Sequence, residues 1–130
     1  MNAKRQQSSR KPPARRYAAK LLFQWRVMVD GSSGKRRLCE ERIISFQSTH
    51  GRTALREARR RGRAAQHSFT NSDGNWVHFE FVGTIELLCL GPECEADEVW
   101  YEITERIRPM ERRAKLIPPE SRLHAIRNRD

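Results

Sequence analysis

Three histidines, together with two cysteines or the carboxylates, are the side chains that could carry catalysis. They are His50, His67 and His78, with Cys39, Cys89 or the carboxylates as their partners. A nucleophile needs a base within hydrogen-bonding reach and a third group that orients the base, and no segment gathers such a set. His78 lies two residues before Glu80, so the two side chains share one face of a predicted strand. Strand neighbours of this kind often pair without doing chemistry, and we predict a non-enzymatic protein that uses no cofactor.

The cysteines lack the spacing of a common metal site. Cys89 and Cys94 are five residues apart, which does not match the two-residue knuckle of common zinc sites, and no second pair follows. An odd number of cysteines fits a reducing compartment. We therefore predict incidental or structural cysteines, no bound metal and a cytoplasmic location.

Arginines are concentrated between residues 52 and 63, where six Arg stand against one Glu. Arginine binds phosphate through two parallel hydrogen bonds, so this segment is a candidate for neutralising nucleic-acid phosphates while exposed aromatic rings stack on bases. The candidate phosphate-binding residues are Arg52, Arg56, Arg59, Arg60 and Arg63. Against this hypothesis, most aromatic residues occupy inward-facing strand positions, which leaves only Trp76 and Trp100 as exposed rings.

A second charged segment, residues 93–105, carries six acidic residues and no base. One interpretation is that the acidic and arginine-rich segments face each other or form solvated surfaces. The other is that the acidic edge meets a basic protein partner, with an aromatic anchor among the charges. The partner-binding candidates on this second interpretation are Glu95, Asp97, Glu98 and Trp100.

The formal net charge of +10 belongs to the ends of the chain. Residues 1–16 carry six bases and no acid, residues 107–130 carry seven bases and three acids, and residues 17–106 carry thirteen of each. We predict a disordered basic arm over 1–16, an α+β domain over 17–106 and a basic extension over 107–130. No apolar run approaches the roughly 20 residues that span a bilayer, and we predict no membrane partner.

The first half of the predicted domain is a hairpin followed by a helix. Apolar residues at alternate positions over 17–27 predict a strand with one buried face. A flexible turn over 30–34 leads to a second strand over 38–47, which makes an antiparallel hairpin. Small residues at helical spacing predict a helix over 51–61 that ends at Gly62.

The second half adds two strands. A tight turn over 71–75 precedes a strand that begins at Val77 and bulges at Gly83. A last strand is expected around residues 99–103, and a short helix over 109–116 with proline at its first position. The predicted fold is α+β: a four-stranded, mostly antiparallel sheet in the order β-β-α-β-β, with one helix packed on a face and a short C-terminal helix.

The order of several short motifs resembles one family. The motifs are Tyr17-Ala18-Ala19-Lys20-Leu21-Leu22-Phe23, Cys39-Glu40-Glu41-Arg42-Ile43-Ile44-Ser45-Phe46, Phe69-Thr70-Asn71-Ser72-Asp73-Gly74, Phe81-Val82-Gly83 and Glu98-Val99-Trp100-Tyr101. Together they resemble the small bacterial proteins catalogued as domain of unknown function 4288, over roughly residues 17–106. The resemblance implies a small bacterial cytoplasmic protein and no particular substrate.

These observations favour a non-enzymatic binding protein that acts through a protein partner, for example in an immunity-like or adaptor role. The alternative is a weakly specific or non-specific nucleic-acid-binding protein that uses the arginine-rich helix and the basic ends. Nothing in the sequence selects an oligomeric state.

Overall fold

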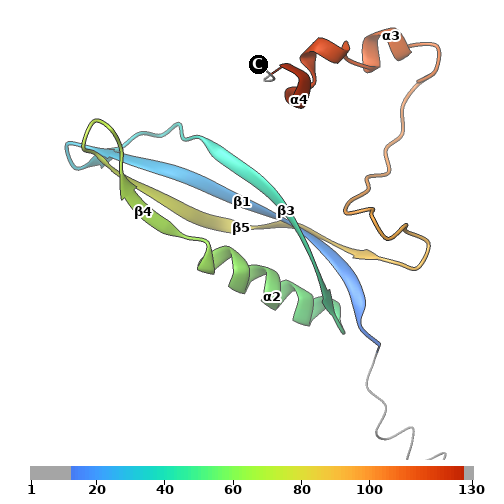
Figure 1. Ribbon diagram of the computed structural model, residues 1–130, viewed down its shortest axis with the longest axis horizontal. Helices are drawn as coiled ribbons and strands as arrows, with labels where there is room; N and C mark the ends of the chain where they lie inside the picture. Colours follow the sequence, from blue (N-terminus) through green and yellow to red (C-terminus); the bar gives the residue numbers. More distant parts are fainter. Residues whose placement is uncertain (1–12, 128–130) are drawn as a thin grey trace, which may run out of the picture.

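The computed structural model describes residues 13–127 and has an α+β fold, which confirms the predicted fold class. The strands are β1 (Arg15–Val29), β2 (Ser32–Ser33), β3 (Cys39–Ser48), β4 (His67–Thr70) and β5 (Trp76–Leu90). The helices are α2 (Gly51–Ala64), α3 (Arg113–Leu116) and α4 (His124–Arg127), with a 3-10 turn at Glu120–Arg122. Figure 1 shows α2 lying along one face of the sheet. None of the helices in this described range is long and apolar enough to cross a bilayer.

β1 is the central strand of an antiparallel sheet. It pairs with β3 and β2 along one edge and with β5 along the other, and β4 pairs with the outer edge of β5. The β1–β2 connection is a two-residue turn in which Asp30 and Gly31 have φ values of 52° and 76°. An Asp-Gly pair suits this left-handed geometry. β1 begins at Arg15, two residues before the predicted strand, and most of the predicted N-terminal arm lies outside the described residues.

The face of the sheet that α2 covers carries the hydrophobic core. The core residues are Tyr17, Ala19, Leu21 and Phe23 of β1, Phe46 of β3, Phe79 of β5, and Ala54 and Ala58 of α2. The alternation in β1 therefore has the predicted buried face. The small side chains of Ala54 and Ala58, both fully buried, let the helix backbone approach the strands closely.

Gly62 does not end α2 as predicted. The helix continues to Ala64, and Gly62 is buried in its last turn. The reason is packing, because the ring of Phe81 occupies the space beside the Gly62 backbone. Gly62 therefore serves as a contact point between the helix and β5.

The predicted irregularity in β5 is confirmed at Gly83. Leu22 pairs with Gly83 but Phe23 pairs with Phe81, so one residue of β5 is skipped. A second shift occurs between Lys20 and Leu21. Bulges of this kind bend a strand and increase its twist, and both lie in the middle of the long β1–β5 pair.

The predicted strand at residues 99–103 is wrong, and the short strand β4, which was not predicted, pairs with β5 instead. No strand is assigned between residues 98 and 106, and the side chain of Ile103 is 89% exposed. β4 instead forms a hairpin with β5 across the predicted turn, in which Gly74 has a φ of 79°. A short turn closes this hairpin at small entropic cost, whereas residues 99–103 follow β5 after an eight-residue loop, 91–98.

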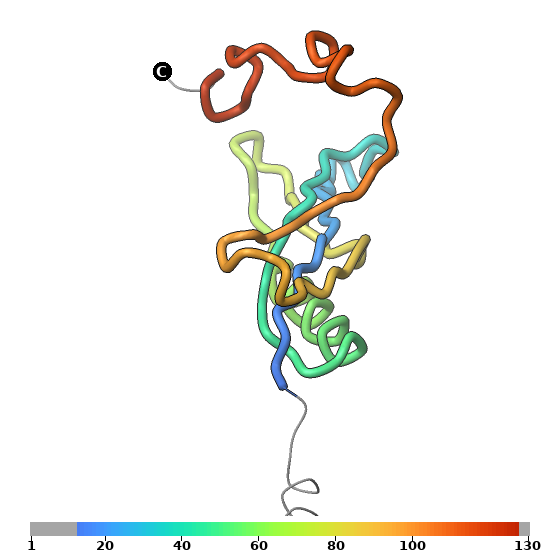
Figure 2. Tube along the Cα trace, turned by 90° about the vertical axis from the view of Figure 1, so that its right-hand side faces the viewer, coloured from blue at the N-terminus to red at the C-terminus, as the bar shows by residue number. Residues whose placement is uncertain are grey.

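The C-terminal helix is shorter than predicted. Only Arg113–Leu116 is α-helical, while residues 109–112 form turns. Figure 1 and Figure 2 show the chain leaving the sheet after β5, with α3 and α4 placed apart from the sheet. The predicted basic extension thus has short helical turns of its own.

Candidate functional site

Four exposed arginines of α2 form a row along the outer side of the helix. They are Arg52, Arg56, Arg59 and Arg63, and we call them the arginine stripe. Since helical residues three and four apart share a face, the stripe lies opposite the buried residues Ala54, Ala58 and Gly62. At 1.5 Å per residue, the stripe is about 16 Å long. None of its four side chains forms an ion pair with another residue of the described range 13–127.

Glu57 binds the two remaining arginines of the helix. Its carboxylate accepts two hydrogen bonds from Arg60, at 2.9 and 2.7 Å, and one from Arg61 at 2.7 Å. These bonds lower the pKa of Glu57 to about 2. The guanidinium of Arg61 also lies 4.9 Å from the ring centroid of Phe46. Of the predicted phosphate-binding residues, Arg60 is therefore paired with a carboxylate within the helix, whereas the four residues of the arginine stripe are not.

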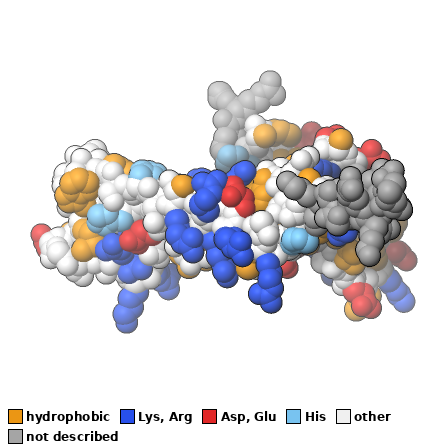
Figure 3. Space-filling view, turned by 90° about the horizontal axis from the view of Figure 1, so that it is seen from below, with side chains coloured by type: hydrophobic (Ala, Val, Ile, Leu, Met, Phe, Trp, Pro, Cys, Tyr) orange, Lys and Arg blue, Asp and Glu red, His pale blue; other side chains and the backbone are white. Residues whose placement is uncertain are grey.

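The surface over α2 is strongly basic. Figure 3 views the molecule from this side, and Lys and Arg side chains project over the middle of the face with few acidic side chains among them. Like charges gathered on one surface add their fields and attract anions of extended shape. Because α2 is packed on the sheet through buried residues, the sheet holds this row of charges in place.

Two exposed aromatic rings lie on the same side of the sheet, beyond the C-terminal end of α2. They belong to His67 and Phe69 of β4, whose ring centroids are 5.8 Å apart with 24° between the planes. The His67 ring packs at 5.2 Å against Phe79 of the core, and its Nδ1–H donates a hydrogen bond of 3.1 Å to the Ala65 carbonyl. Phe69 is 41% exposed. We call this pair the aromatic ledge.

The aromatic ledge is not evident from the local sequence, because Phe69 is the single apolar residue of β4 and this strand has no alternation of its own. The available signal was the turn at residues 71–75, since a hairpin turn requires a strand before it as well as after it. On such a strand, His67 and Phe69 share one face.

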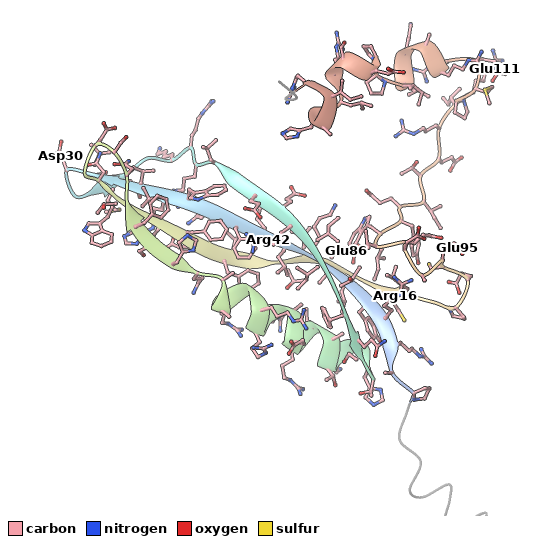
Figure 4. All side chains as sticks on the ribbon, in the orientation of Figure 1. Arg16, Asp30, Arg42, Glu86, Glu95 and Glu111 are labelled. Carbon is pink, nitrogen blue, oxygen red and sulfur yellow. The ribbon has the colours of Figure 1, made fainter. Side chains whose placement is uncertain are left out.

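Arg16 holds in place the loop that follows β5, residues 91–98, which we call the acidic loop. Its guanidinium donates hydrogen bonds to the backbone carbonyls of Glu95 (2.8 Å), Ala96 (3.3 Å) and Glu98 (2.5 Å), and Figure 4 shows Arg16 and Glu95 at the same end of the sheet. The Glu98 carboxylate accepts a bond of 3.0 Å from the Glu95 N–H. Among the predicted partner-binding acids, Glu95 and Asp97 are exposed and Glu98 is half-buried.

Trp100 packs against the sheet face opposite α2. The ammonium group of Lys20, a β1 residue on that face, lies 5.1 Å from the Trp100 ring centroid. The side chain is half-buried rather than exposed as predicted. The acidic loop and the arginine stripe therefore do not face each other, and within residues 13–127 no ion pair joins them.

The predicted pairing of His78 with Glu80 is not formed. Arg26 donates two hydrogen bonds to the Glu80 carboxylate, at 2.9 and 2.7 Å, and Gln24 donates a third at 2.9 Å. His78 Nδ1 instead lies 2.6 Å from the Ser68 hydroxyl oxygen. No described side chain is bonded to the other ring nitrogen of His78, so the Ser–His pair lacks the third group that orients a catalytic base.

The three cysteines are free thiols. Within the described part of the chain, no three His, Cys, Asp or Glu side chains are grouped closely enough to hold a metal ion. No family model, curated protein or solved structure matches the chain. The resemblance to domain of unknown function 4288 therefore stays a prediction.

Proposed function

We propose that the protein binds nucleic acid through phosphate contacts made by the arginine stripe. The observation that supports this proposal is the row of four exposed arginines, which lacks acidic partners among the described residues. A row about 16 Å long covers several successive phosphates of one strand, which are about 3.4 Å apart along the duplex axis. The proposed activity is binding, without a chemical step.

Binding through phosphates has a measurable signature, because each neutralised phosphate releases condensed counterions. The logarithm of the binding constant for duplex DNA falls with the logarithm of salt concentration, with a slope of about −0.9 per contact. Four contacts give a slope of about −3.6, or a loss of affinity of roughly 100-fold between 50 and 200 mM salt.

The test is a fluorescence anisotropy titration of the full chain with a labelled duplex of about 20 base pairs. Replacing Arg56 and Arg59 by Ala removes two contacts and is expected to make the slope shallower by about 1.8. The charge-matched control replaces Lys115 and Arg122, which are exposed in the C-terminal extension. If both double variants change the slope equally, binding depends on total charge and not on the arginine stripe.

A protein partner remains the second candidate function. The observation that favours it is the acidic loop, where exposed Glu95 and Asp97 sit on a backbone that Arg16 holds in one conformation. A preordered loop loses little entropy on binding. Replacing Glu95 and Asp97 by Ser is expected to abolish low-salt recovery of such a partner by the purified protein. Equal recovery by both proteins would remove this loop from consideration.

A further inference from the structure

The aromatic ledge has a rigid foundation. Phe69 and His67 stand on a short strand, and His67 rests on Phe79, which is 2% exposed. Phe79 is in turn stacked on Phe23 of the central strand, with ring centroids 4.7 Å apart and 11° between the planes. An exposed ring fixed in this way can accept a flat partner with little loss of conformational entropy.

The ledge continues the basic surface of α2. Arg63, the last member of the arginine stripe, precedes His67 by four residues, and the connection between α2 and β4 is only two residues long. In Figure 3, hydrophobic and His side chains gather at the left end of the face, with Lys and Arg side chains beside them and along the middle of the face. One side of the molecule therefore presents cationic groups followed by exposed aromatic rings.

A small pocket is lined by Trp25, a neighbour of the same core ring. Trp25 lies 5.0 Å from Phe79, and with Leu38 and Arg36 it lines a cavity of about 170 Å³. This volume is below the roughly 300 Å³ at which small-molecule sites begin. The pocket is therefore large enough for one planar ring of a ligand, beside the Arg36 side chain, but not for a complete small-molecule ligand.

From this arrangement we propose that the ligand is single-stranded nucleic acid, whose unpaired bases stack on the aromatic ledge while its phosphates contact the arginine stripe. This inference rests on the proposed function and adds the class of nucleic acid to it. In a duplex the flat faces of the bases are covered by neighbouring base pairs. The exposed rings of the protein therefore find no free base face in a duplex on which to stack. A single strand offers both phosphates and free base faces, and aromatic rings in a basic groove bind it with little sequence preference.

A second exposed aromatic residue provides a matched control. Trp76 of β5 is 54% exposed and stands on the opposite face of the sheet, where its ring is stacked with that of His78. It belongs to the same hairpin as Phe69, because Thr70 pairs with Trp76 and Phe69 pairs with Val77. The hypothesis predicts different results for these two rings, although both are large, apolar and exposed.

The experiment titrates the full chain, Phe69→Ala and Trp76→Ala with a labelled oligothymidylate of about 20 nucleotides and with a duplex of equal length. The Phe69→Ala variant loses one stacked base, so its affinity for the single strand is expected to be about 5- to 100-fold lower than that of the unmodified chain. Duplex binding by this variant and both affinities of Trp76→Ala are expected to stay within about twofold of the starting protein. Phe69→Leu keeps an apolar side chain without a flat ring and is expected to behave like Phe69→Ala, which covers the case in which the Ala variant folds poorly.

The two proposals fail in different ways. If neither the single strand nor the duplex binds, the proposed function is overturned. If the Arg56 and Arg59 variant loses binding while Phe69→Ala and Phe69→Leu bind the single strand like the unmodified chain, the phosphate contacts stand and the stacking inference is overturned. A larger loss for Trp76→Ala than for Phe69→Ala also overturns it, because the bases would then lie on the other face.

Discussion

The ring of Phe81 fills the space where a side chain on Gly62 would lie. A Cβ added to Gly62 would be 2.5 Å from the Cδ1 and Cε1 atoms of Phe81, closer than unbonded carbon atoms come. The absence of a side chain at this position therefore determines how near the last turn of α2 lies to β5. The arginine stripe is on the outer side of that helix, so this contact also sets the height of its last turn above the sheet.

Replacing Gly62 by Ala is expected to destabilise the protein. At most helical positions this change stabilises by about 1 kcal/mol, but here the Phe81 ring must move within the core. We expect a net loss of about 1–3 kcal/mol in the free energy of unfolding, measured by urea denaturation. Gly51→Ala at the other end of α2 is the control, because nothing lies within 4 Å of its added Cβ. Equal stabilities of the two variants would contradict the close contact.

The hydrogen-bonded carboxylate of Glu80 makes the free energy of unfolding depend on pH. Hydrogen bonds from Arg26 and Gln24 lower the pKa of Glu80 from 4.5 to about 2. The charged Glu80 carboxylate therefore contributes its full stabilisation above its unfolded-state pKa, near 4.5. This contribution is lost as the pH falls toward the folded-state pKa of about 2. Glu80→Gln is expected to unfold more easily at neutral pH, by roughly 1 kcal/mol because the pair is partly solvated.

The stability difference between Glu80→Gln and the unmodified chain should shrink between pH 4.5 and pH 2, as followed by denaturant titrations at several pH values. Glu41→Gln is a suitable control, since Glu41 is mostly exposed and lies 4.0 Å from its only ion-pair partner among the described residues. A difference for Glu80→Gln that stays constant over this pH range would mean that Arg26 does not hold the carboxylate in its charged form.

Arg16→Lys is expected to loosen the acidic loop without unfolding the sheet. A lysine keeps the charge but lacks the planar fork that reaches the carbonyls of Glu95 and Glu98. Hydrogen exchange at the amides of Cys94 and Glu98, which are bonded within the loop, should become about tenfold faster. Arg15→Lys, at a neighbouring exposed position, should leave these amides unchanged. If both variants exchange alike, the loop does not depend on Arg16.

Glu57→Gln is expected to strengthen DNA binding. The carboxylate of Glu57 is ionised at neutral pH and occupies Arg60 and Arg61, so its removal frees cations beside the arginine stripe. One additional phosphate contact corresponds to about 5- to 10-fold tighter binding at 0.1 M salt and a steeper salt dependence. Glu111→Gln gives the same change in net charge in the C-terminal segment and should have a smaller effect. Equal gains from both variants would place binding elsewhere on the chain.

The parts of the fold that the sequence predicts well are those with strong local patterns. The alternation from Tyr17 to Phe23 identifies the buried face of β1, and Asn71 and Gly74 identify the turn before β5. β4 was missed because only Phe69 in this strand is apolar, so its pairing with β5 depends on the hairpin and not on its own pattern. Local alternation around residues 99–103 predicted a strand, but this segment forms no strand, and Trp100 packs against Lys20 on the face of the sheet.

In the candidate site, too, the features set by local sequence patterns can be predicted, and those set by contacts between distant segments cannot. Helical spacing alone places the arginine stripe on one face, so Arg52, Arg56, Arg59 and Arg63 could be selected from the sequence. The pairing of Arg60 with Glu57 depends on side-chain conformations that their spacing in the helix permits but does not determine. The aromatic ledge and the packing of Trp100 against Lys20 arise from contacts between distant segments, which local sequence patterns do not report.

The long pairing of β1 with β5 has a consequence for synthesis of the chain. Arg16 of β1 pairs with Leu90 of β5, so the strand of this sheet that is translated first is paired with the strand that is translated last. Contacts between such distant segments form slowly, since a large loop must close before they are made. Until β5 has been translated, one edge of β1 has no strand to pair with, and its unpaired backbone groups are open to pairing with other chains.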